Sequence, residues 1–101
     1  MPTVLTSAQT RFLRGQAHGL KAMLQVGGKG VTPAVIAEVD EALEIHELIK
    51  IKVGAEAREA RDTMIGELAN KLGAALVQRI GHVAILYRQS KDKRQIVLPR
   101  A

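Results

Sequence analysis

The sequence has no cysteine, no tryptophan and only two aromatic residues, Phe12 and Tyr87. Without cysteine, the chain can form neither disulfides nor metal sites with thiolate ligands. Proteins that bind single-stranded nucleic acid on a sheet use several stacking aromatics, and this chain cannot supply such a platform. Any contact with nucleic acid must therefore depend mainly on phosphates and on shape.

Long apolar runs are also missing. No run of this sequence is long enough to cross a bilayer, and "MPTVLTSAQTRFLR" lacks the apolar region of a secretory signal. We therefore expect a cytoplasmic protein with no membrane partner. Its 101 residues, 47% hydrophobic and 25% charged, are typical of one soluble domain over residues 1–101. Residues 90–101 form a polar, basic tail that either pairs as a short edge strand or stays mobile.

Acidic residues are absent from the first third of the chain. The net charge is +5, and residues 1–37 contain four basic residues and no acid. Residues 38–67 hold nine of the ten acids, and residues 68–101 are again basic. This segregation favours a surface that binds a polyanion. The acidic middle leaves open a protein partner.

The first predicted helix covers residues 7–18 and has one apolar and one basic side. Thr6 and Gln9 have the spacing of a capping box, and Gly19 is suited to end the helix. Leu13, Gln16, Ala17 and Leu20 share the side expected to face the core. Four basic residues lie on the opposite side or just after the helix: Arg11, Arg14, His18 and Lys21.

The stretch "VGGKGVTP" (residues 26–33) predicts a glycine loop between a strand and a helix. Gly27, Gly28 and Gly30 can adopt positive φ angles, and Lys29 adds a cation. Thr32 and Pro33 are a suitable N-cap and first residue for the next helix, whose free N–H groups then face the loop. The loop suits a phosphate, although a purely structural turn is the alternative. A nucleotide-binding P-loop is excluded because no serine or threonine follows Lys29 directly.

The remaining pattern predicts the order α-β-α-β-α-β-β. After the helix at residues 33–47 come a strand at residues 48–53, a helix ending at Gly73, and two strands joined by Gly81-His82. Two strand-helix-strand units predict parallel neighbours, and the hairpin adds an antiparallel pair. We predict an α/β fold, a two-layer sandwich of three helices on a mixed four-stranded sheet.

Side-chain environments follow from the same periodicity. In the second helix we expect His46 on the buried face, as a hydrogen-bonded core residue. Asp40, Glu41, Glu44 and Glu47 are expected on a solvated face. In the third helix the residues expected to face inward are Ala57, Ala60, Met64, Ile65, Leu68 and Leu72.

No arrangement of residues predicts catalysis. His18, His46 and His82 are widely spaced and lack the H-E-x-x-H pattern of a zinc site. No serine or threonine stands out as a nucleophile, and the carboxylates lie on solvated helix faces, where their pKa values are hard to tune. We therefore expect no enzymatic activity, metal, cofactor or small-molecule substrate.

Four ordered motifs resemble the YhbY family of bacterial proteins, which are single copies of the CRM domain (chloroplast RNA splicing and ribosome maturation). They are "R-F-L-R-x-Q-A-H", the G-x-x-G loop, "H-E-L-I-K" and "I-G-H-V-x-x-L-Y-R". The resemblance extends from about Leu5 to Leu98. It implies a fold similar to the C-terminal domain of translation initiation factor three. It also implies RNA binding and association with precursors of the large ribosomal subunit.

The family's G-x-x-G loop is similar to that of KH domains and corresponds here to residues 27–30, so the resemblance implies that these residues contact RNA. Many relatives carry a basic residue directly after the first glycine, whereas this chain has Gly28 there and keeps its lysine at Lys29. Together with the basic helix, the resemblance predicts an RNA-binding site at Arg11, Arg14, His18, Lys21, Gly27, Gly28, Lys29 and Gly30.

The sequence thus supports a non-enzymatic RNA-binding protein that binds ribosomal RNA in large-subunit precursors. The alternative is a protein-interaction module whose acidic middle docks a basic ribosomal protein or an assembly factor. A small basic domain of this kind is most simply a monomer.

Overall fold

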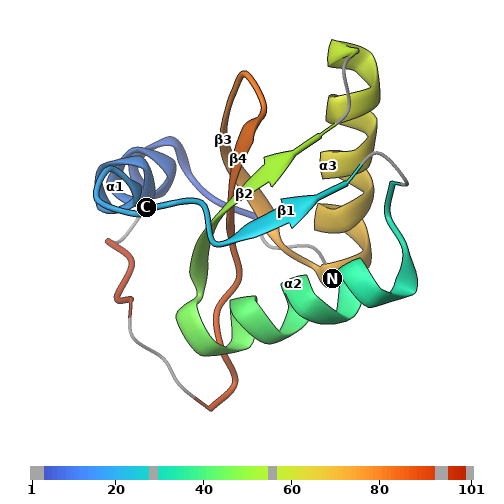
Figure 1. The fold of residues 1–101 in the computed structure, drawn as a ribbon. Coiled ribbons are helices and arrows are strands. Elements are labelled where there is room, and N and C mark those ends of the chain that lie inside the picture. Colours follow the sequence, from blue (N-terminus) through green and yellow to red (C-terminus); the bar gives the residue numbers. More distant parts are fainter. Residues whose placement is uncertain (1–3, 28–29, 55–56, 93–95, 100–101) are drawn as a thin grey trace.

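The computed structural model describes residues 4–27, 30–54, 57–92 and 96–99. Its helices and strands follow the predicted order (Figure 1): α1 Ser7–Ala17, β1 Leu24–Val26, α2 Pro33–His46, β2 Leu48–Val53, α3 Arg58–Leu72, β3 Ala75–Ile80 and β4 Val83–Tyr87. The α/β class and the mixed four-stranded sheet are confirmed. None of the helices in the described chain is long and apolar enough to span a membrane.

The helix boundaries come from local hydrogen bonds that the sequence predicted. Thr6 Oγ1 accepts from the N–H of Gln9 at 3.1 Å, and Gln9 Oε1 accepts from the N–H of Thr6 at 3.0 Å. The Thr32 hydroxyl accepts from the N–H of Val35 at 3.2 Å and caps α2. Gly73 ends α3 with φ +64°, a left-handed conformation that glycine adopts without strain.

The strand order in the sheet is β1-β2-β4-β3. β1 and β2 are parallel neighbours, as the first strand-helix-strand unit predicted. The second strand-helix-strand unit, β2-α3-β3, does not place its two strands side by side. Instead β4 lies between β2 and β3 and pairs antiparallel with both. The reason is burial: four of the five residues of β4 are buried, so this strand takes a central position covered on both faces.

Helices cover both faces of the sheet (Figure 1). On one face α2 and α3 form the larger core with β2 and β4, through residues such as Leu43, Ile51 and Leu68. On the opposite face α1 packs Leu13 and Ala17 on a second core, which also contains Leu48, Val77, Ile85 and Tyr87. The predicted two layers correspond to the sheet with α2 and α3. α1 adds a third layer, because β4 is apolar on both faces and Leu48 of β2 and Val77 of β3 extend the apolar surface on the α1 side.

The side-chain environments at the end of α2 differ from the prediction. His46 is exposed, whereas Glu47 is fully buried. The helix ends at His46, and Glu47 takes φ +63°, which breaks the helical periodicity and turns its side chain inward. Its carboxylate accepts from the backbone N–H groups of Ser90 at 2.7 Å and Ile96 at 2.8 Å.

Two other acidic residues of α2 hold the end of β4. Arg88 Nη1 lies 2.7 Å from Asp40 Oδ1, and Arg88 Nη2 lies 3.3 Å from Glu44 Oε1. Arg88 also donates to the carbonyl oxygen of Leu72 at 3.0 Å. The face that periodicity predicted as solvated is therefore partly occupied by an internal ion-pair network.

The first turn of α3 is also more exposed than predicted. Ala57 is the N-cap of α3, and both Ala57 and Ala60 are exposed, whereas Ile65 and Leu68 are buried. Figure 1 shows this end of α3 beyond the tips of β1 and β2, and its first turn reaches the β3–β4 hairpin through Arg61, whose Nη1 lies 3.5 Å from His82 Nε2.

The described part of the C-terminal segment crosses the α1 side. Ile96 and Leu98 pack on the second core, and Gln9 Nε2 donates to the carbonyl oxygen of Pro99 at 3.0 Å. Residues 96–99 are not in a strand.

Candidate nucleic-acid interface

α1 presents the three basic side chains that its periodicity predicted. Arg11, Arg14 and His18 are exposed, and so is Lys21 just beyond the helix. Within the described residues, the ion pairs join Arg79 to Asp62 and Arg88 to Asp40 and Glu44. The cations of α1 are in none of them, so their charges face solvent.

Two lysines of β2 lie on the same face of the sheet as α1. Lys50 and Lys52 alternate with Ile49, Ile51 and Val53, which are buried in the core on the opposite face. Lys50 Nζ donates to the carbonyl oxygen of Leu20 at 2.9 Å, so it also fixes the segment after α1. Lys52 is exposed. Six residues together form the basic face: Arg11, Arg14, His18, Lys21, Lys50 and Lys52.

Sequence reasoning did not assign Lys50 and Lys52 to the site, although both lie in the strand predicted at residues 48–53. The alternation of "LIKIKV" was the available signal. This alternation does not indicate where α1 packs on the sheet. Because α1 packs on the face that carries Lys50 and Lys52, these lysines adjoin the basic side of the helix.

A small hollow of about 110 Å³ lies where α1 meets the sheet. Arg14, His18 and Lys50 supply three basic side chains to its wall. The other lining residues are uncharged: Ala17, Gln78, Ile80 and Ile85. Ile80 is 63% exposed and gives the hollow an apolar rim. Cations beside an accessible apolar surface can hold a phosphate while the attached sugar or base contacts the aliphatic side chains.

The glycine loop follows β1. The N–H of Gly30 donates to the carbonyl oxygen of Gly27 at 3.2 Å. Gly30 has φ +85°, a conformation that favours glycine, whereas Gly27 does not need one. A Cβ atom on Gly27 would have no neighbour within 4 Å, so this position is open to solvent. The predicted site residues Gly28 and Lys29 lie outside the described residues.

The basic helix and the glycine loop are not adjacent. β1 runs away from the α1 side, and Gly27 follows at its far end (Figure 1). Lys50 and Lys52 bridge this interval: the carbonyl of Lys50 accepts from Met23, and Lys52 is in register with Gln25. The predicted positions are thus linked by two residues of β2 that the prediction left out.

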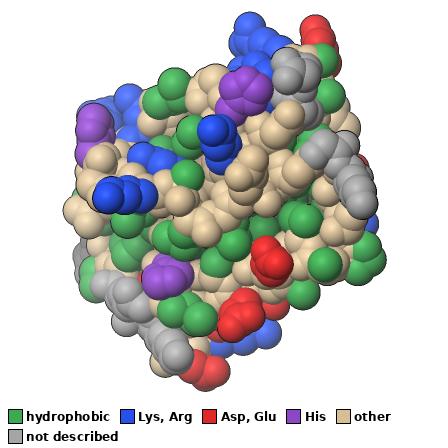
Figure 2. All heavy atoms as spheres, viewed as in Figure 1, with side chains coloured by type: hydrophobic (Ala, Val, Ile, Leu, Met, Phe, Trp, Pro, Cys, Tyr) green, Lys and Arg blue, Asp and Glu red, His purple; other side chains and the backbone are tan. Residues whose placement is uncertain are grey.

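The surface over α1 and the adjoining part of the sheet is basic. Figure 2 shows Lys, Arg and His side chains over α1 and the adjoining part of the sheet, and Asp and Glu side chains along α2 below. A polyanion approaching from the α1 side therefore meets attraction without local repulsion.

No metal-binding cluster is found in the described ranges. No group of three or more His, Asp or Glu residues in this part of the chain is arranged to hold a metal ion. His82 is exposed in the β3–β4 turn, and its Nδ1 donates to the carbonyl oxygen of Val53 at 2.9 Å. Its second ring nitrogen lies 3.5 Å from Arg61 Nη1, so this histidine joins the hairpin to β2 and α3.

The chain is similar to several known proteins. The family model of the CRS1 / YhbY (CRM) domain matches residues 5–88. A Haemophilus influenzae protein named "RNA-binding protein" is 44% identical over 98 residues, which cover 97% of this chain and 98% of the relative. A Bacillus subtilis protein named "Probable RNA-binding protein YqeI" is 42% identical over 96 residues, covering 95% of this chain and 100% of the relative. The solution structure of a Staphylococcus aureus protein matches with a TM-score of 0.82 at 34% identity, and it covers 95% of this chain and 100% of that one.

Proposed function

Because the chain belongs to the CRS1 / YhbY (CRM) domain family, we propose that it is a non-enzymatic, cytoplasmic RNA-binding protein. It contacts the RNA backbone through the basic face and the G-x-x-G loop. The names of the Haemophilus influenzae and Bacillus subtilis relatives support RNA as the class of partner.

The observation that carries the proposal is the composition of the basic face. Six cationic or titratable basic residues lie on α1, just after it and on β2, and none of them is in an ion pair with a described carboxylate. With few aromatics available for stacking, the binding energy must come mainly from phosphate contacts and from the release of counterions.

Salt dependence tests this mechanism. If the six residues of the basic face each neutralise one phosphate, the logarithm of the association constant falls with the logarithm of salt concentration with a slope of roughly −4 for single-stranded RNA. The measurement is fluorescence anisotropy of a labelled RNA between 50 and 200 mM salt, a range of about fourfold. A slope near zero would show that phosphate contacts do not drive binding.

The glycine loop makes a separate prediction. Gly27 is open to solvent and has no conformational need for glycine, so Gly27→Ala leaves the free energy of unfolding within about 0.5 kcal/mol of the parent. If an RNA backbone packs closely on the loop, the added methyl group lowers RNA affinity about fivefold. Urea unfolding and anisotropy are measured on the same sample. Unchanged affinity in the folded variant would remove Gly27 from the interface.

Gly30→Ala is the matched variant for that test. At φ +85° an alanine is strained by about 1 kcal/mol, so this change lowers stability as well as affinity. Comparing the two glycines separates close approach of a ligand from the conformational requirement of the turn.

The RNA is proposed to be ribosomal RNA in precursors of the large subunit. A tagged protein is then expected to cosediment with these particles in a sucrose gradient and to be released by ribonuclease. Release by nuclease would support direct RNA contact. Retention would favour the alternative, in which the protein docks a basic ribosomal protein or an assembly factor.

The structure reduces the acidic surface available for that alternative. Asp40 and Glu44 are engaged by Arg88, and Glu47 is buried. Only part of the acidic middle can therefore meet a partner, and RNA binding by the basic face remains the favoured function.

A further inference from the structure

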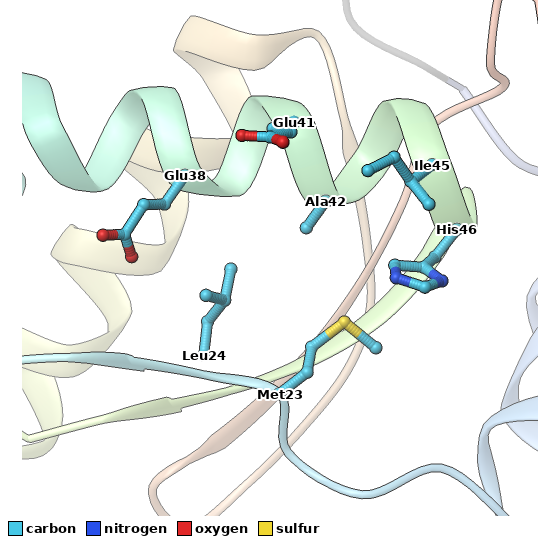
Figure 3. Close-up of a pocket in the computed structure, with 7 residues that line it drawn as sticks. All are labelled: Met23, Leu24, Glu38, Glu41, Ala42, Ile45 and His46. Carbon is cyan, nitrogen blue, oxygen red and sulfur yellow. The ribbon is translucent and has the colours of Figure 1, made fainter.

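A second surface lies between β1 and α2, away from the basic face. Figure 3 shows Met23 and Leu24 pointing up from the β1 segment and Ala42 and Ile45 pointing down from α2, with a hollow between them. The hollow has a volume of about 290 Å³. Glu38, Glu41 and His46 complete its lining, so an apolar floor has a polar rim.

The floor is accessible rather than covered. Met23 is 37% exposed and Ile45 is 36% exposed. A second hollow of about 200 Å³ shares Met23 and His46 with the first and continues to Leu20, Leu48 and Ile96. The first hollow forms a groove between β1 and α2, and a gathering of exposed apolar side chains such as Met23 and Ile45 marks a site of interaction.

The charge of the rim identifies the class of occupant. Glu38 and Glu41 are exposed one helical turn apart, and neither has an ion pair within the described chain. The neighbouring carboxylates of Asp40 and Glu44 are instead engaged by Arg88. Two free carboxylates repel a phosphate backbone but attract lysine and arginine side chains. RNA is therefore disfavoured here and a basic polypeptide is favoured.

We propose that this groove binds a short segment of a basic protein, with apolar side chains on the floor and Lys or Arg side chains at Glu38 and Glu41. Among the described residues β1 has one strand neighbour, β2, so its outer edge is open to an extended segment. The inference goes beyond the proposed RNA contact. Because the basic face lies on the α1 side, the protein can hold RNA and a basic protein together.

The test is an NMR titration of the ¹⁵N-labelled protein with the synthetic peptide Ser-Lys-Leu-Lys-Leu-Lys-Ser, in which leucines alternate with lysines. The amide signals of Leu24, Ala42 and Ile45 are expected to shift in a saturable way, with a Kd below about 1 mM. Replacing the lysines of the peptide with glutamate, or its leucines with serine, is expected to abolish the shifts.

Matched protein variants assign the site. Glu41→Lys is expected to weaken peptide binding about fivefold, because it replaces an attraction with a repulsion. Glu67→Lys makes the same charge change at an exposed position of α3 and is expected to change binding less than twofold. Ile45→Ser removes an apolar side chain from the floor and is expected to weaken peptide binding. Its control is Leu76→Ser on β3, because Leu76 is also an exposed apolar residue, with 46% of its surface accessible.

Several results would overturn the proposal. They are the absence of saturable shifts, equal shifts with the glutamate peptide, or equal loss in Glu41→Lys and Glu67→Lys. Shifts of the same amides on raising the protein concentration without peptide would assign the groove to a second copy of the chain. RNA affinity, measured on the same Glu41→Lys sample, is expected to be unchanged or higher, so failure here leaves the RNA proposal standing.

Discussion

Reversing two charges of the basic face, Arg14→Glu with Lys52→Glu, is expected to lower RNA affinity about 100-fold. A hydrogen bond to a charged group contributes about 1.5 kcal/mol or more, and losing two such contacts corresponds to about two orders of magnitude in Kd. Both side chains are exposed and neither is in an ion pair with a described carboxylate, so the fold is expected to persist. Anisotropy at fixed salt measures the affinity, and circular dichroism checks the fold.

The control carries the same change in net charge elsewhere. Arg58→Glu with Lys71→Glu lies on α3, on the opposite side of the sheet from α1, and both parent side chains are exposed. We expect this variant to lose RNA affinity only a few-fold, because it weakens only the long-range electrostatic attraction between the protein and RNA. Equal losses in the two double variants would mean that net charge, and not the basic face, drives binding.

The second large effect concerns stability. Glu47→Ala is expected to lower the free energy of unfolding by about 3 kcal/mol, because the buried carboxylate accepts from two backbone N–H groups, those of Ser90 and Ile96. In the alanine variant the N–H of Ser90 loses its buried acceptor. Urea unfolding measures the loss, and hydrogen exchange is expected to accelerate at the amides of Ser90 and Ile96.

Two further substitutions separate the loss of the buried carboxylate from backbone strain and from the general effect of removing a carboxylate. Glu47→Gly also removes the carboxylate but relieves the left-handed φ of +63°, so it is expected to be about 1 kcal/mol more stable than Glu47→Ala. Glu67→Ala removes an exposed carboxylate from α3 and is expected to change stability by less than about 0.5 kcal/mol. If Glu47→Ala behaves like Glu67→Ala, the carboxylate does not hold the C-terminal segment.

This anchor also affects the side of the molecule that carries the basic face. Ile96 and Leu98 pack against the second core, under α1, and Pro99 accepts from Gln9 at the start of that helix. Glu47 fixes the segment at Ile96, so a side chain at the end of α2 helps to support the helix that presents Arg11, Arg14 and His18.

Local sequence signals predicted the local structure well. The capping box at Thr6 and Gln9, the Thr32-Pro33 start of α2 and the end of α3 at Gly73 depend on neighbouring residues, so they can be recognised without the fold. The exposure of Arg11, Arg14 and His18 followed from helical periodicity for the same reason.

Long-range relationships could not be predicted in this way. Periodicity does not say which face of the sheet α1 covers, so Lys50 and Lys52 were not assigned to the site. The insertion of β4 between β2 and β3 depends on burial of β4 on both faces. The burial of Glu47 depends on one positive φ angle and on backbone groups more than 40 residues away in sequence.

The basic face and the groove lie on different sides of the domain and differ in charge. In the two proposals, the cations on α1 and β2 bind RNA, and the groove between β1 and α2, whose Glu38 and Glu41 have no ion pair among the described residues, binds a basic protein. The internal pairs of Arg88 with Asp40 and Glu44 keep part of the acidic helix out of this arrangement.

The most direct test of the central claim is an NMR titration of the ¹⁵N-labelled protein with an RNA stem-loop. Saturable shifts are expected for the amides of residues 11–21 and 50–53 and for Gly27 and Gly30, with little change in residues 38–46 of α2. Shifts concentrated on α2 and its groove, or no saturable shifts on the α1 side, would contradict the assignment of RNA binding to the basic face.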